Sequence, residues 1–308
     1  MKLTNHQITE IYSLANKGYS HRRIAEIVLD RRSRKSTVSD LLRNNKEEVV
    51  VIKKPVIVYL DIETAPCLGY YWKRWEENIS EAQVVSESFI ICYSYKLAGD
   101  EEIYFNVLNP IEIDTEDDSR LMKDLSKVLN NADIVIAHNG IRFDIPIIQT
   151  RMLYHGLTPP LPYKVIDTLR MAKRNFKFPS NSLSSLAIYL KLTRKTSPNG
   201  GFNLWKGFLK CEEEAIQTMI DYNINDVVVL EELYLKLRPW DKSHPNLAIY
   251  DNSDIRICPV CSSKNISQTD KFSYTNISAF VVHKCDDCGK NFRDRKSINK
   301  KNKLFTSI

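Results

Sequence analysis

No run of apolar residues in this 308-residue chain approaches the roughly 20 that a transmembrane helix needs. The opening residues, Met1-Lys2-Leu3-Thr4, lack the apolar stretch of a secretory signal peptide. Internal repeats and low-complexity tracts are also missing. We therefore expect a soluble, cytoplasmic protein. Its hydrophobic share of 43% and charged share of 27% are ordinary for a globular chain that buries a core.

The seven cysteines are an odd number, so they cannot all pair as disulfides. Four of them form two Cys-x-x-Cys pairs, while Cys67, Cys92 and Cys211 are scattered. In a cytoplasmic protein this pattern favours metal binding over disulfide bonding.

The net charge of +6 is unevenly distributed along the chain. Residues 1–54 and residues 253–308 each carry six more Lys and Arg than Asp and Glu, so the middle carries six more acids than bases. Basic ends indicate a polyanionic partner. An acidic centre is typical of a carboxylate-rich cation site. The alternative is three solvated surfaces of different charge.

Residues 1–45 predict three short helices. Gly18 breaks the first periodic run, and Ser20 and Ser36 are expected to cap the second and third helices, on either side of the polar stretch 30–35. The apolar positions at helical spacing are Ile8, Ile11, Tyr12, Leu14, Ile24, Ala25, Ile27, Val28, Val38, Leu41 and Leu42. This is the plan of a helix-turn-helix.

The stretch from Gly18 to Ala25, followed by Ser36-Thr37-Val38, resembles the helix-turn-helix of resolvase- and transposase-type proteins. That resemblance implies DNA binding. The alternative is a small helical module that binds protein. Residues 46–54 are predicted to be a linker.

Residues 55–245 alternate strand and helix patterns. The β-branched runs predict strands at 56–60, 89–95, 103–107 and 134–137, and the helical patterns lie at 121–129, 145–155, 166–175, 182–190 and 212–236. The expected fold class is therefore α/β, with a mixed sheet flanked by helices.

Acidic residues follow the predicted strand ends of this segment. Asp61 and Glu63 are two apart after a buried strand, so their carboxylates face the same way. Asp144 heads a predicted helix just beyond the strand that ends at Ala137. Tyr222 and Asp226 are four apart on a long helix and share a face. Clustered carboxylates of this kind suit two hard cations about 4 Å apart, the arrangement that hydrolyses phosphodiesters.

In this order, Asp-Ile-Glu-Thr, Asn-x-x-x-Phe-Asp and Tyr-x-x-x-Asp resemble the three motifs of the DnaQ-like 3′–5′ exonuclease superfamily, in its DEDDy branch. The resemblance covers residues 55–240 and is nearest to stand-alone exonucleases similar to the proofreading domain of family B DNA polymerases. It implies a ribonuclease-H-like fold.

The resemblance also implies roles for single residues. Asp61, Glu63, Asp144 and Asp226 would ligate two Mg²⁺ or Mn²⁺ ions, and Tyr222 would orient the attacking water. Asn139 and Phe143 would contact the substrate. Catalysis would then rest on these four carboxylates and the tyrosine.

Four neighbouring features need an interpretation, and three of them have two interpretations each. Asp167 either caps the helix after it or supports the site from behind, and His138 is interpreted as structural. The aromatic stretch at 70–75 either stacks on single-stranded bases or packs inward from a helix. The cations around the glycine-rich loop either touch phosphates or are solvated; they are Lys191, Arg194, Lys195 and Lys206.

Cys258-Pro259-Val260-Cys261 and Cys285-Asp286-Asp287-Cys288 are predicted to be two knuckles that hold one structural Zn²⁺. The segment 253–295 resembles a zinc ribbon, with an apolar, hairpin-like run at 277–282, and is followed by a basic tail at 296–308. A core this small needs the metal to fold. Redox activity of the pairs and docking to a protein are the alternatives.

The sequence thus predicts a metal-dependent 3′–5′ exonuclease that acts on nucleic-acid 3′ ends, with single-stranded DNA favoured over RNA as the substrate. The alternatives are an exoribonuclease, a structure-selective nuclease, and a DNA-binding regulator built on an inactive nuclease scaffold. A polymerase or another replication or recombination protein is the expected kind of partner, and the combination of modules suggests a phage setting.

Overall fold

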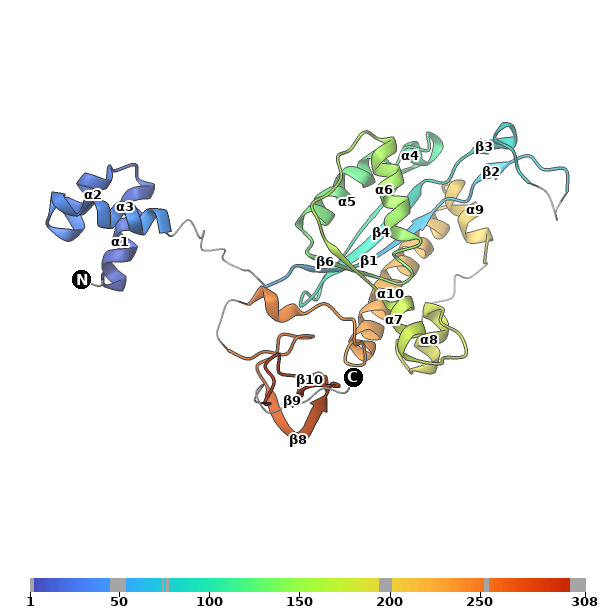
Figure 1. Ribbon diagram of the computed structural model, residues 1–308. Helices are drawn as coiled ribbons and strands as arrows, with labels where there is room; N and C mark the ends of the chain where they lie inside the picture. Colours follow the sequence, from blue (N-terminus) through green and yellow to red (C-terminus); the bar gives the residue numbers. More distant parts are fainter. Residues whose placement is uncertain are drawn as a thin grey trace. The chain divides into compact units, whose positions relative to one another are not determined.

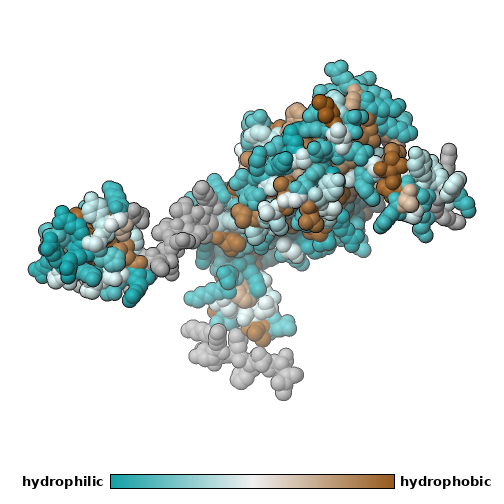
Figure 2. Space-filling model, turned by 90° about the horizontal axis from the view of Figure 1, so that it is seen from above, coloured by the Kyte–Doolittle hydropathy of each residue, from teal (hydrophilic) through white to brown (hydrophobic). Residues whose placement is uncertain are grey.

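A computed structural model describes residues 3–44, 54–73, 75, 78–193, 201–251 and 255–299. The chain divides into two compact units, Met1–Ile52 and Lys53–Ile308, and each is described by itself. Among the described residues, no helix combines the length and the apolar character needed to cross a membrane. Hydrophilic residues cover most of the face of the molecule seen in Figure 2.

The larger unit is built on a mixed five-stranded sheet in the order β5-β4-β1-β6-β7. Its strands are β1 (Ile57–Thr64), β4 (Ile90–Leu97), β5 (Ile103–Val107), β6 (Ile134–Ala137) and β7 (Lys164–Asp167). The pairs β1–β4 and β4–β5 are antiparallel, whereas β1–β6 and β6–β7 are parallel. The α/β fold class and the mixed sheet predicted from the sequence are confirmed.

Helices cover both faces of this sheet (Figure 1). Because successive side chains of β1 point to opposite faces of the sheet, Val58 and Leu60 pack in one core with α5 (Ser119–Asn131) and α6 (Asp144–Tyr154). Tyr59 faces the other way, into a core with α10. The helices associated with α10 (Glu213–Leu237) are α7 (Thr168–Asn175), α8 (Leu183–Tyr189) and α9 (Asn203–Leu209). A short helix, α4 (Pro110–Asp114), precedes α5.

The sequence pattern located most of these elements, with two corrections. The helix predicted at 166–175 was wrong at its start, because Ile166 and Asp167 belong to the short strand β7 and α7 begins at Thr168. The strand predicted at 56–60 continues to Thr64, so Asp61 and Glu63 lie within β1 rather than after it. The strand β7 was missed because it runs directly into α7 without a loop, so its last two residues joined the helical pattern.

The smaller unit contains the three helices expected, α1 (Asn5–Asn16), α2 (His21–Leu29) and α3 (Lys35–Asn44). Ser20 caps α2 as predicted, accepting a hydrogen bond from the Arg23 backbone N–H at 3.4 Å. The cap predicted at Ser36 is wrong, because α3 already starts at Lys35 after a 3-10 turn, η1 (Arg32–Arg34). Ile27 is 41% exposed and so lies outside the small core.

The C-terminal part of the larger unit is a three-stranded sheet in the order β10-β9-β8. The strands are β8 (Ile266–Tyr274), β9 (Ala279–Cys285) and β10 (Asn291–Arg293). The hairpin-like run predicted at 277–282 lies in a hairpin, because β8 and β9 pair antiparallel, with Ile277 in their connection and Ala279 to Val282 in β9. This sheet is tied to the rest of the unit by two hydrogen bonds at 2.7 Å, from Lys290 Nζ to the Asp241 carbonyl and from the Leu247 N–H to the Pro259 carbonyl.

Three predicted features fall largely outside the described residues. They are the linker at 46–54 except Lys54, the loop cations Arg194 and Lys195, and the basic tail beyond Asn299.

Candidate active site

Three acidic side chains converge where β1 meets α10. Potential ligand oxygens of Asp61, Glu63 and Asp226 all lie within 4.8 Å of one another. Asp61 and Glu63 share one face of β1 because side chains alternate along a strand. Asp226 comes from the middle of α10, the helix that packs on β1. The packing of one helix on one strand thus brings together residues more than 160 positions apart.

Asn223, which the sequence analysis did not identify, belongs to this cluster. Its Nδ2 donates a 2.7 Å hydrogen bond to Oδ2 of Asp61, and the side chain is buried. Asn223 directly follows Tyr222 and lies one helical turn before Asp226. Nothing in the local pattern distinguished it from any other helical asparagine, since its partner lies on β1.

Asp144 occupies the first position of α6 and lines the same cleft. It lies outside the group of three whose oxygens fall within 4.8 Å. The carboxyl group is buried and accepts a hydrogen bond from the Ile62 backbone N–H. Burial, followed by repulsion from Asp167, raises the pKa of Asp144 to about 7. A cation beside this carboxylate would offset both effects.

The cleft around these carboxylates has a volume of about 470 Å³. Tyr222, Asn139 and Phe143, three of the predicted site residues, all line it. Phe143 is 40% exposed, so its ring is available to a ligand. Lys173 of α7 also lines the cleft and adds a cation to an otherwise acidic wall. Sequence reasoning missed Lys173, because it is one of three cations on a short polar helix.

The turn between β6 and α6 shapes one edge of the cleft. Asn139 adopts a positive φ of 68°, and a Cβ on Gly140 would lie 2.4 Å from the Ala137 Cβ, so only glycine fits there. Asp167 accepts hydrogen bonds from the Asn139 and Ile141 backbone N–H groups at 3.1 and 3.3 Å. Its carboxylate also caps α7 through the Arg170 N–H. Asp167 therefore fills both of the roles proposed for it.

His138 lies beside this turn and is held on both sides. Its Nδ1 is 2.9 Å from Thr168 Oγ1 and its Nε2 is 3.0 Å from the Asn181 carbonyl. Both ring nitrogens are therefore engaged by the fold. This confirms the structural interpretation of His138, although its side chain also lines the cleft.

The aromatic stretch after β1 does not pack inward from a helix. Described residues of this stretch have no helical assignment, and the aromatic side chains are exposed. The inward-packing interpretation is therefore wrong. Lys206, one of the predicted loop cations, lies 5.7 Å from the centre of the Phe202 ring, and its contact with phosphate stays a prediction.

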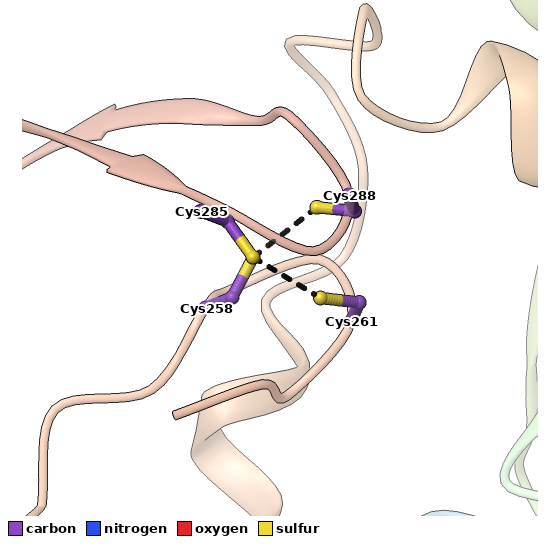
Figure 3. Close-up of side chains that lie close together, drawn as sticks. All are labelled: Cys258, Cys261, Cys285 and Cys288. Atoms are coloured by element: carbon purple, nitrogen blue, oxygen red, sulfur yellow. Dashed lines mark hydrogen bonds between the residues drawn. The ribbon is translucent and has the colours of Figure 1, made fainter. Parts of the chain in front are cut away.

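The second cluster is formed by the four knuckle cysteines, whose sulfur atoms all lie within 4.8 Å of one another (Figure 3). Sγ of Cys258 is 3.7 Å from that of Cys288, and Sγ of Cys261 is 3.6 Å from that of Cys285. Four sulfurs at about 2.3 Å from a tetrahedral Zn²⁺ would be about 3.8 Å apart. The geometry therefore suits one tetrahedral ion.

The two clusters differ in donor chemistry. Carboxylate oxygens suit hard cations such as Mg²⁺ or Mn²⁺, whereas four thiolates suit Zn²⁺. Burial raises the pKa of Cys258 to about 11, so its thiolate form needs a nearby cation. Residues present at each site thus fit the metal class expected from the sequence.

Comparisons with known proteins place this geometry in a family. Residues 81–238, just over half of the chain, match the RNase_H superfamily. Asp144, Tyr222 and Asp226 lie inside that match, whereas Asp61 and Glu63 precede it.

Two individual proteins are also similar to parts of the chain. A 71-residue stretch is 39% identical to a DNA polymerase III PolC-type protein of Mycoplasma genitalium. The matched stretch makes up 22% of this chain and 5% of that protein. The family B DNA polymerase of the archaeon Pyrobaculum calidifontis is similar over 61% of this chain and 25% of its own, with 14% identity and a TM-score of 0.45. The chain thus spans only a small part of the length of either protein. On the family match, the chain belongs to the RNase_H superfamily.

Proposed function

We propose that this protein is a metal-dependent 3′–5′ exonuclease that hydrolyses phosphodiester bonds at nucleic-acid ends. The observation that carries the proposal is the convergence of Asp61, Glu63 and Asp226 within 4.8 Å, with Asp144 in the same cleft. Four carboxylates repel one another unless cations neutralise them. In this member of the RNase_H superfamily, hydrolysis of a phosphodiester is the chemistry that the clustered carboxylates support best.

Each side chain then has a defined task. The four carboxylates would hold two divalent cations, Mg²⁺ or Mn²⁺, and these cations would supply activation of a water and stabilisation of the leaving oxygen. Tyr222 lies one turn from Asp226 and orients the attacking water through its hydroxyl group. Asn223 keeps the carboxylate of Asp61 in place.

The substrate end would be held by residues of the turn between β6 and α6 and by α7. Phe143 offers a partly exposed ring for the terminal base, and Asn139 sits on a turn fixed by Asp167. The cation of Lys173 is available to a phosphate. Preference for a 3′ end rests on the resemblance of the three motifs to DEDDy exonucleases.

The two attached modules support DNA as the substrate. We assign residues 1–45 to a helix-turn-helix that binds DNA, residues 55–245 to the exonuclease, and residues 253–295 to a zinc ribbon. Exposed Arg31 and Arg32 lie just before α3 and suit contact with phosphates. A replication or recombination protein is the kind of partner that such an exonuclease would serve.

The proposal is tested with 5′-labelled single-stranded DNA, duplex DNA and RNA incubated with Mg²⁺ or Mn²⁺. We expect a one-nucleotide ladder that Asp61→Ala and Asp226→Ala reduce by about 100-fold or more, because metal ions supply several kcal/mol of transition-state stabilisation. Tyr222→Phe should lower kcat by about 100-fold with little change in KM. Glu214→Ala, an exposed carboxylate on the same helix, is the matched control.

The outcome also discriminates between the alternatives. A ladder on RNA alone would make the protein an exoribonuclease, and cleavage at internal junctions would make it structure-selective. Folded protein that binds DNA but cuts no substrate with either metal would contradict the proposal and favour a regulator on an inactive scaffold.

A further inference from the structure

The segment that follows the candidate site carries exposed aromatic residues that nothing in the cleft uses. It leaves β1 after Thr64, forms the short strands β2 (Leu68–Gly69) and β3 (Val84–Ser86), and returns to β4. Figure 1 shows β2 and β3 extending past the end of β1 and β4. We call residues 68–86 the aromatic arm.

The base of the arm is firmly built. Gly69 pairs with Val84, and a Cβ on Gly69 would lie 2.9 Å from the Gln83 carbonyl oxygen, so the two strands approach as closely as glycine permits. The Tyr70 backbone is fixed twice by Gln83, through its N–H at 2.8 Å and its carbonyl at 3.0 Å. The aromatic residues therefore project from an ordered support.

The aromatic side chains of the arm are turned to solvent. Tyr70 is 76% exposed, Tyr71 61%, Trp72 93% and Trp75 83%. A buried aromatic side chain removes about 150–250 Å² of surface from water. Leaving four such side chains exposed therefore gives up a large hydrophobic contribution to the stability of the fold. Such a group of exposed aromatic residues marks a surface that binds something else.

Position and charge indicate what that partner is. Tyr70 is seven residues from Glu63, so its backbone lies within about 25 Å of the carboxylates, a length that about seven stacked nucleotides span. Lys73 is exposed between Trp72 and Trp75, whereas the three acids of the arm, Glu76, Glu77 and Glu81, all follow Trp75, so the cation lies among the rings and the acids lie to one side in the sequence. Flat rings interleaved with a cation suit unpaired bases and their phosphates.

We propose that the aromatic arm binds the single-stranded part of the substrate, upstream of the nucleotide in the cleft. This inference rests on the proposed nuclease function and adds to it the class of substrate: a strand with several unpaired nucleotides. Paired bases expose no faces to stack on, so duplex ends gain nothing from the arm.

The test compares oligonucleotide length in binding and in cleavage. Binding of fluorescent dT3 and dT20 is measured on an Asp226→Asn background, with and without Trp72→Ala and Trp75→Ala. We expect the double substitution to weaken binding of dT20 by about 10-fold to 100-fold, since each stacked base contributes about 1–3 kcal/mol. Binding of dT3, which is too short to reach the arm, should stay unchanged, as should binding of blunt duplex.

Two controls separate stacking from damage to the fold. Trp72→Phe with Trp75→Phe keeps flat rings and should restore most of the affinity for dT20. Tyr154→Ala removes an equally exposed ring on α6 and should have no effect. On otherwise wild-type protein, the alanine pair should raise KM for dT20 cleavage with little change in kcat.

Equal binding of dT20 by the arm variants and the parent protein would overturn the inference and leave a protein partner as the use of this surface. An equal loss on dT3 and dT20 would also overturn it, because a general defect is independent of length. The binding measurement does not depend on cleavage. If the protein cleaved no substrate, the proposed function would be contradicted, but the binding data would still show whether the arm binds single strands.

Discussion

At the scale of single residues, the candidate site depends on one amide that orients one carboxylate. Asn223 donates to Asp61 at 2.7 Å from a fully packed position on α10. A buried amide in this place restricts the carboxylate to one orientation without adding charge to a cluster already rich in it. Replacing a group that orients a metal ligand typically lowers metal affinity or activity by about 10-fold to 100-fold.

Asn223→Ala should therefore weaken Mn²⁺ binding by about 10-fold to 100-fold while leaving the fold intact. Asn223→Asp should be worse, because it sets a fifth carboxylate against Asp61. Calorimetric titration with Mn²⁺ measures both effects, and Gln217→Ala, an exposed amide on the same helix, is the control. Affinity equal to that of the parent protein in Asn223→Ala would show that the hydrogen bond does not orient the ligand.

At the scale of secondary-structure elements, a buried ion pair joins β4, α5 and α6. Asp118, just before α5, accepts two hydrogen bonds at 2.8 Å from Arg151 of α6 and one at 2.9 Å from the Ile90 N–H at the start of β4. His155 Nε2 lies 2.5 Å away. Burial alone would raise the pKa of Asp118, but these donors hold it below its usual range. The carboxylate thus fixes the helix layer opposite α10.

Asp118→Asn should destabilise the protein by about 3–5 kcal/mol at pH 7, because it leaves the mostly buried Arg151 without its charge partner. A carboxylate with a lowered pKa in the folded state stabilises above its unfolded pKa, about 3.9, and loses that contribution as pH falls through the folded value. The gap between variant and parent should therefore narrow from pH 7 to pH 3.

Urea unfolding at both pH values measures this gap. Asp114→Asn, which removes an exposed carboxylate four residues earlier, should change the free energy of unfolding by less than about 0.5 kcal/mol. If the difference in unfolding free energy between Asp118→Asn and the parent protein stayed constant from pH 7 to pH 3, the stabilising role of the ionised Asp118 would be contradicted.

At the scale of the whole molecule, the small sheet of β8, β9 and β10 depends on its cysteine cluster. Its buried apolar core is little more than Val260 and the cysteines, with Phe292 packed beside them. A core of this size cannot offset the entropy of ordering some 40 residues. We propose that a bound zinc ion, which contributes roughly 10 kcal/mol or more in structural sites, supplies most of the missing stability.

Purified protein should therefore contain about one zinc per chain, and Cys261→Ser should lose most of it. Amide hydrogen exchange should then accelerate throughout β8–β10, while β1 and β4–β7 keep their protection. Cys67→Ser, at an exposed cysteine outside the cluster, should retain zinc and protection. Full protection of β8–β10 in the metal-free variant would show that this sheet folds without an ion.

Spacing along the chain was sufficient for the parts of this protein that local geometry controls. A strand period of two set Asp61 beside Glu63, a helical turn set Tyr222 beside Asp226, and the paired Cys-x-x-Cys knuckles specified the sulfur cluster. These features depend on backbone geometry within a few residues, which the amino-acid order encodes directly.

Other features exist only because distant elements pack together. The approach of Asp226 to β1, the contact between Asn223 and Asp61, and the triple anchoring of Asp118 each join segments that no local period relates. The exposure of the aromatic arm is of the same kind, since the sequence of Trp72 and Trp75 suited an inward-packing helix equally well. Whether a side chain is exposed or buried depends on what packs against it, and that packing exists only in the folded chain.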